Sequence, residues 1–80
     1  MVEITAQYFA VFRERAGRDR EVLATRSNTA VALFAEVSKR HGFRDSAASC
    51  KVAINGEMVR WDTPLASGDV VLFFPPVAGG

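Results

Sequence analysis

The pattern of apolar and polar residues along this 80-residue chain predicts short strands around one main helix. Apolar residues at every second position from Val2 to Tyr8 indicate a first strand with one buried face. The alternation breaks at Phe9, where the spacing of apolar residues fits a helical turn that ends at Gly17. The segment from Arg20 to Ala24 is expected to return as a second strand beside the first.

A longer helix is predicted from Ala30 to His41. N-cap residue types precede it at positions 27–29, and Gly42 follows where a left-handed residue commonly ends a helix. Residues at helical spacing form its expected buried stripe: Ala30, Val31, Leu33, Phe34, Val37 and His41.

The second half of the chain predicts a hairpin. The segment Phe43 to Ser49 is polar and without period, which is typical of a loop. Alternation from Cys50 to Ile54 indicates a third strand, and Asn55-Gly56 is a strong signal for a type I′ turn. The segment Glu57 to Trp61 is then expected to form the fourth strand.

The last strand is predicted to be central. No polar residue interrupts Val70 to Phe74, so this strand is expected to be buried on both faces and parallel to the first strand, with the helix as crossover. Pro75 and Pro76 end the ladder because they lack N–H groups. The expected fold class is α+β: a β-grasp (ubiquitin-like) roll over residues 1–76, with about five strands in a mixed sheet and one main helix on one face, followed by an extended tail at 77–80.

Composition limits the possible functions. A hydrophobic fraction of 49% and a charged fraction of 24% are typical of globular proteins and argue against disorder. A net charge of +1 gives no electrostatic argument for nucleic acid. The longest apolar stretch, Val70 to Val77, is too short for a membrane span. The start of the sequence shows no secretory leader, so a cytoplasmic location is expected.

The sequence contains no pattern of an independent active site, and no bound metal or cofactor is expected. Cys50 stands alone, and without a cationic cluster it is expected to be structural rather than a reactive thiol. His41 is a ligand or general base in one interpretation; the other, which we favour, has it interact with the carbonyl end of its helix. The charges of Arg13–Arg20 indicate a solvated connection, with an anion or partner patch as the alternative.

The C-terminal residues are the unusual feature. Val77 to Gly80 can span about 13 Å when extended. Gly79 and Gly80 have no side chains, so they fit a channel too narrow for other residues. These properties suggest that the α-carboxylate of Gly80 is the reactive group.

The run Phe73-Phe74-Pro75-Pro76-Val77-Ala78-Gly79-Gly80 resembles the C-terminus of the molybdopterin synthase small subunit family, which are sulfur carriers with a β-grasp fold. Shorter matches support the resemblance upstream, at Tyr8-Phe9-Ala10, Arg13-Glu14, Asp62-x-Pro64-Leu65 and Gly68-Asp69. A Gly-Gly end alone is less specific, because ubiquitin-like modifiers and the thiamin-pathway sulfur carrier share it.

The resemblance implies a function for the tail. In the family, a ubiquitin-activating-like adenylyltransferase uses ATP to adenylate the C-terminal glycine, here Gly80, and sulfur then forms a thiocarboxylate. The tail, here Val77, Ala78, Gly79 and Gly80, inserts into the large subunit of a heterotetramer of two small and two large subunits. There it donates sulfur to cyclic pyranopterin monophosphate and builds the dithiolene of molybdopterin. The small subunit is itself non-catalytic.

The partner interface is expected at the root of the tail, at Phe74, Pro75, Pro76 and Phe9. Core packing is the alternative for each aromatic residue. Trp61 is either a packing residue or part of a partner surface.

Other functions stay open at this point. A protein modifier joined to lysines through Gly80 would share the adenylation step, although Ala78 stands where ubiquitin has Arg. The thiamin-pathway carrier is disfavoured by Pro75-Pro76. A β-grasp interaction module whose Gly-Gly end has no role is the third alternative.

Overall fold

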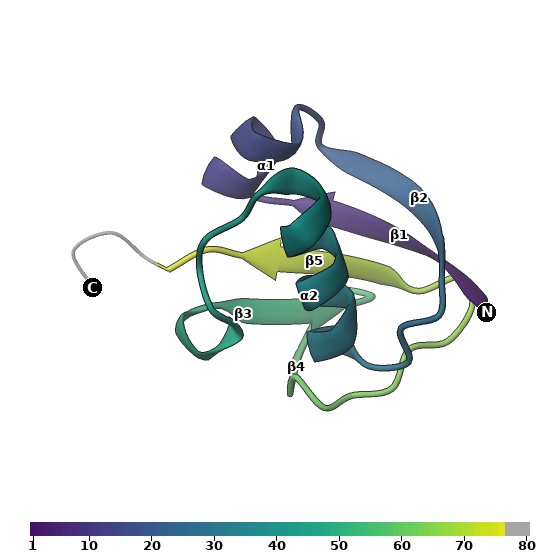
Figure 1. Cartoon of the computed structure of the whole chain (residues 1–80). Helices are drawn as coiled ribbons and strands as arrows, with labels where there is room; N and C mark the ends of the chain where they lie inside the picture. Colours follow the sequence, from purple (N-terminus) through teal and green to yellow (C-terminus); the bar gives the residue numbers. More distant parts are fainter. Residues whose placement is uncertain (77–80) are drawn as a thin grey trace.

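The computed structural model describes residues 1–76 of the chain. Within this range, five strands and three helical segments are arranged as one sheet with its main helix on one face (Figure 1). In chain order the elements are β1 (Val2–Tyr8), α1 (Val11–Ala16), β2 (Arg20–Thr25), α2 (Ala30–His41), the 3-10 helix η1 (Ala47–Ser49), β3 (Lys51–Ile54), β4 (Glu57–Val59) and β5 (Val70–Phe74).

The sheet has the strand order β2-β1-β5-β3-β4, which places the last strand at its centre. β5 runs parallel to β1, with Tyr8 opposite Phe73, and antiparallel to β3, with Lys51 opposite Phe74. A parallel pair requires a crossover connection, and the chain between β1 and β5 includes α2, which crosses the sheet (Figure 1). The predicted β-grasp arrangement is therefore confirmed.

The helix α2 packs its apolar stripe on the sheet. The hydroxyl oxygen of Thr29 accepts a hydrogen bond from the Ala32 N–H at 3.3 Å, and Gly42 ends the helix with φ 75°. The prediction for Val31 is wrong: this side chain is 41% exposed. A helix turns about 100° per residue, so Val31 lies to one side of the buried stripe, which consists of Ala30, Leu33, Phe34 and Val37.

The prediction that β5 is buried on both faces is wrong for one face. Val71 and Phe73 are completely buried against α2, but Leu72 and Phe74 on the other face are only partly buried. The reason is architectural: α2 covers one face of the sheet, and within residues 1–76 no helix lies on the other face (Figure 1).

The first connection also differs from the prediction. The helix α1 begins at Val11, so Phe9 lies outside it, with its side chain 54% exposed. Phe12 is the buried residue of α1, and Gly17 ends the helix with φ 76° as predicted.

The hairpin between β3 and β4 has the predicted turn. Asn55 and Gly56 both have positive φ, 53° and 86°, as a type I′ turn requires. β4 ends at Val59, earlier than predicted, because the chain then leaves the sheet, and the carbonyls of Trp61 and Thr63 accept hydrogen bonds from the first N–H groups of α2. The predicted loop that begins at Phe43 contains a core residue, since Phe43 is buried and stacks on Phe12 with ring centroids 4.4 Å apart. No helix among residues 1–76 has the length and apolar character needed to cross a membrane.

Candidate functional site

The candidate site is the root of the C-terminal tail. The predicted tail residues Val77, Ala78, Gly79 and Gly80 lie outside the described residues, whereas Phe74, Pro75 and Pro76 lie within them. β5 is the central strand of the sheet and is hydrogen-bonded on both sides, by β1 and β3, so the tail follows a strand that is fixed by two neighbours.

The predicted interface residues come together at this root. The rings of Phe9 and Phe74 contact each other with centroids 5.6 Å apart, although the residues are distant in sequence. Phe9 is exposed, Phe74 and Pro75 are partly buried, and Pro76 is exposed. These side chains form an apolar surface where the chain leaves the sheet.

An open cavity lies beside the same root. It has a volume of about 690 Å³ and is lined by Phe9, Ala10, Val11, Glu14, Arg15, Asp45, Pro75 and Pro76. Its walls are thus mainly apolar, with three charged residues among them. An apolar pocket with a few charged groups is suited to a side chain of a protein partner.

Some apolar residues continue from the tail root along the sheet face that α2 does not cover. Leu72 lies between Gln7 and Ala53 on neighbouring strands, and Met58 follows Ala53 in the next strand. Met58 is 59% exposed, and Val22 at the other edge of the sheet is 62% exposed. This surface is not among the features predicted from the sequence, although the outward-facing positions of the predicted hairpin, such as Met58, were a signal for it.

A cluster of polar side chains joins β1, β2 and α2 on the face of the sheet that α2 covers. The Tyr8 hydroxyl donates a hydrogen bond to Glu21 Oε2 at 2.5 Å, and His41 Nε2 lies 2.5 Å from the same oxygen. Arg18 and Arg40 lie 3.8 and 3.9 Å from Glu21 Oε1. The sequence prediction that His41 interacts with the carbonyl end of α2 missed this carboxylate partner.

The charge of Glu21 is stabilised by its neighbours. Burial alone raises the pKa of this carboxyl, but the hydrogen bonds from Tyr8 and His41 and the positive charge of Arg40 outweigh it, so the pKa lies below its usual value. Burial, together with the hydrogen bond and charge of Glu21, raises the pKa of the Tyr8 phenol. Tyr8 is therefore a neutral donor, and the cluster ties β1, β2 and α2 together.

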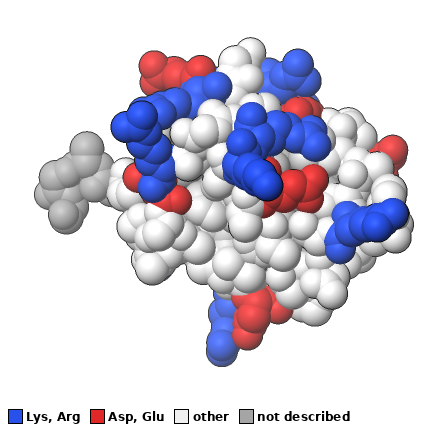
Figure 2. All heavy atoms as spheres, viewed as in Figure 1, with Lys and Arg blue, Asp and Glu red and all other residues white. Residues whose placement is uncertain are grey.

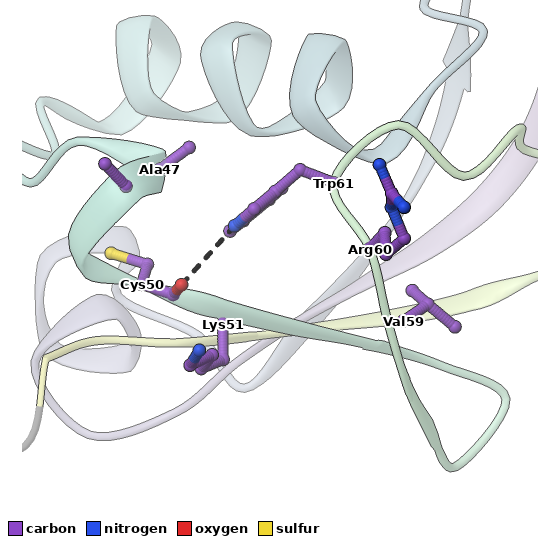
Figure 3. A pocket seen from close by; sticks show the side chains of 7 residues that line it. Ala47, Cys50, Lys51, Val59, Arg60 and Trp61 are labelled. Atoms are coloured by element: carbon purple, nitrogen blue, oxygen red, sulfur yellow. Dashed lines mark hydrogen bonds between the residues drawn. The ribbon is translucent and has the colours of Figure 1, made fainter.

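A second cavity, of about 390 Å³, lies near Cys50 and Trp61 (Figure 3). Trp61 reaches across it, and its Nε1 donates a hydrogen bond to the Cys50 carbonyl at 3.4 Å (Figure 3). The Cys50 side chain is buried, and burial raises the pKa of its thiol. Both residues thus have packing roles here, and the thiol lacks the character of a nucleophile.

The remaining charged residues do not form a site of one sign. Arg13 pairs with Asp19 at 3.7 Å and Arg18 with Glu21, as expected for a solvated connection with mixed charges. Figure 2 shows that acidic and basic side chains lie next to one another on the face crossed by α2. Among residues 1–76, no three His, Cys, Asp or Glu side chains are arranged to hold a metal ion.

The sequence of this chain is similar to a protein family and to a characterised sulfur carrier. The ThiS family matches residues 6–80 of this chain. The molybdopterin synthase sulfur carrier subunit of Escherichia coli (strain K12) is 38% identical over 80 residues, covering 96% of this chain and 99% of that protein.

Solved structures show the same fold. A molybdopterin converting factor, subunit 1, from Pyrococcus furiosus has a TM-score of 0.79 and 37% identity, covering 96% of this chain and 100% of that one. A chain from the complex of subunits 1 and 2 of the molybdopterin-converting factor from Helicobacter pylori 26695 has a TM-score of 0.67 and 24% identity, covering 99% and 100%.

Proposed function

This chain belongs to the ThiS family, and we propose that it is the sulfur carrier subunit of a molybdopterin synthase. The observation that carries the proposal is the similarity over nearly the whole chain to the Escherichia coli sulfur carrier subunit, with 38% identity. The Phe73–Gly80 run at the end of the sequence, on a β-grasp fold, supports the same function.

The chemistry begins with activation of the Gly80 carboxylate. A carboxylate is a poor electrophile, so its oxygen first attacks the α-phosphate of ATP, and pyrophosphate leaves. A ubiquitin-activating-like adenylyltransferase performs this step and holds the ATP. A persulfide sulfur then displaces AMP, and a second thiol releases the thiocarboxylate on Gly80 while a disulfide forms.

The loaded carrier then delivers its sulfur to cyclic pyranopterin monophosphate. A dithiolene contains two sulfur atoms, so each molybdopterin requires two loaded carriers, which suits an assembly of two small and two large subunits. The large subunit supplies the pocket and the catalytic side chains, as is general when a carrier holds the reactive group. Hydrolysis returns Gly80 to its carboxylate form.

The described residues of this chain have three tasks in this scheme. The central strand β5, which precedes the tail, is fixed in the sheet by hydrogen bonds to β1 and β3. Pro75 and Pro76 restrict the backbone, which lowers the entropy lost when a partner orders the chain beyond them. Phe74 and Phe9 offer aromatic anchors of the kind that commonly dominate protein interfaces.

The test is an intact-mass measurement of the full chain after incubation with the adenylyltransferase, ATP and a sulfur donor. We expect one oxygen to be replaced by sulfur, located at Gly80 by fragmentation. A variant that lacks Gly80 has the same folded domain and should show no exchange. Persistent absence of the exchange in the wild-type chain, with adenylation intact, would argue against a sulfur carrier; Gly80 in isopeptide linkage to lysines would favour a protein modifier instead.

A further inference from the structure

Ala10 has a backbone conformation that L-residues rarely adopt, with φ 55° and ψ −122°. The N–H of Phe12 donates a hydrogen bond to the Phe9 carbonyl at 3.2 Å, so Ala10 occupies the first central position of a type II′ turn. Glycine normally takes this position because a Cβ is unfavourable there. Asn55, the other non-glycine residue with positive φ in residues 1–76, belongs to a type that tolerates it.

Core residues that precede and follow Ala10 in the chain hold it in this strained conformation. Before it, Tyr8 is buried, and its N–H donates a hydrogen bond to the Asp19 carbonyl at 2.8 Å. After it, Phe12 is buried and stacks on Phe43. The chain must turn between these two anchors, so Ala10 cannot relax to an ordinary conformation without moving one of them.

A glycine at position 10 would avoid the strain, but the sequence has alanine there. Glycine at position 10 would form the same turn without a steric penalty, and would remove the methyl group of a residue that lines the cavity at the tail root with Pro75 and Pro76. Strained residues concentrate at functional sites, where binding compensates for the loss of stability. A contact between this methyl group and a partner bound at the cavity would explain why alanine, rather than glycine, occupies position 10.

We propose that Ala10 is a partner-contact residue whose methyl group packs against an apolar side chain of the molybdopterin synthase large subunit. This inference rests on the proposed function, because a partner that surrounds the tail must meet the surface at its root. The apolar wall and the charged residues Glu14, Arg15 and Asp45 beside it match the apolar centre and polar rim of protein interfaces.

The test is the variant Ala10→Gly, measured twice. Relief of the strain, reduced by the greater freedom of glycine in the unfolded chain, should raise Tm by roughly 5 °C. Loss of one methyl contact should weaken binding to the large subunit roughly three- to fivefold, as measured by calorimetry. A role in folding alone cannot raise stability while lowering affinity.

The matched control is Ala66→Gly, at an exposed loop residue near the opposite end of β5. It should leave affinity unchanged and Tm equal or lower. If Ala10→Gly binds as tightly as wild type, or lowers Tm, the inference is wrong. If the wild-type chain does not bind the large subunit, the proposed function itself fails. A change confined to self-association, measured by sedimentation, would also contradict the inference, because it would assign the surface to a second copy.

Discussion

Glu21 carries a mostly buried negative charge where β1, β2 and α2 meet. Its pKa is lower in the folded protein than in the unfolded chain, so folding favours the ionised form. The stabilisation is complete at pH values above the unfolded pKa, near 4.5, and is lost as the pH falls through the lower folded pKa. Acid should therefore weaken the fold partly through this residue.

The variant Glu21→Gln tests this account. It should lose about 2 kcal/mol of stability at neutral pH, because a charged, hydrogen-bonded partner of Tyr8 and His41 becomes neutral. Its free energy of unfolding, from urea titrations between neutral and acidic pH, should also decline less steeply than that of wild type. Glu57→Gln, at an exposed position, is the control and should keep the wild-type slope. A wild-type slope in Glu21→Gln would show that another group controls the acid response.

At the scale of elements, the Asn55 turn aligns β3 with the central strand. Besides its positive φ, Asn55 accepts a hydrogen bond from the Val70 N–H at 2.9 Å and donates one to Asp69 Oδ1 at 3.0 Å. Its own N–H donates to the Val70 carbonyl at 2.8 Å. The turn residue thus fixes where β5 begins, and with it the register that ends at Phe74.

Two substitutions separate the contributions of Asn55. Asn55→Ala should cost about 2 to 3 kcal/mol, because it loses the side-chain hydrogen bonds and places a Cβ where positive φ is strained. Asn55→Gly keeps the conformation and should cost only about 1 kcal/mol. Urea titration measures both. Equal losses in the two variants would show that the left-handed conformation contributes nothing.

Elements with a local signal could be predicted from the sequence, and those set by long-range contacts could not. The period of β1, the caps of α2 and the Asn55-Gly56 turn are each encoded by neighbouring residues. An unbroken apolar run such as Val70–Phe74 indicates a central strand but does not reveal which face stays uncovered. The apolar spacing of Phe9 and Phe12 predicts a helical turn that includes Phe9, and alanine at position 10 gives no signal for the type II′ turn that the structure has there.

At the candidate site, too, features with a local signal could be predicted from the sequence, and long-range contacts could not. The sequence predicts the tail motif and an aromatic residue near Phe74, either Phe9 or Phe12; the structure has Phe9 in contact with Phe74 and Phe12 in the core. The bond between His41 and Glu21 joins residues 20 positions apart and depends on the final packing of α2 beside β2. No periodicity in the sequence signals such a contact.

At the scale of the whole molecule, the sheet brings separate segments of the chain together at the root of the tail. The parallel strands β1 and β5 end on the same side of the sheet, with Tyr8 opposite Phe73. Phe9 therefore contacts Phe74, and Ala10 lines a cavity together with Pro75 and Pro76, next to the start of the tail. The β-grasp topology thereby brings segments far apart in sequence together around the tail root, at the surface that we propose binds the partner.

The most direct test of this account is a single-turnover sulfur transfer. The chain loaded with a Gly80 thiocarboxylate is mixed with the large subunit and cyclic pyranopterin monophosphate, and both protein mass and pterin product are followed in time. We predict that the thiocarboxylate reverts to a carboxylate as the dithiolene appears, with two carriers consumed per molybdopterin. A thiocarboxylate that persists in the assembled complex while no dithiolene forms would contradict the account.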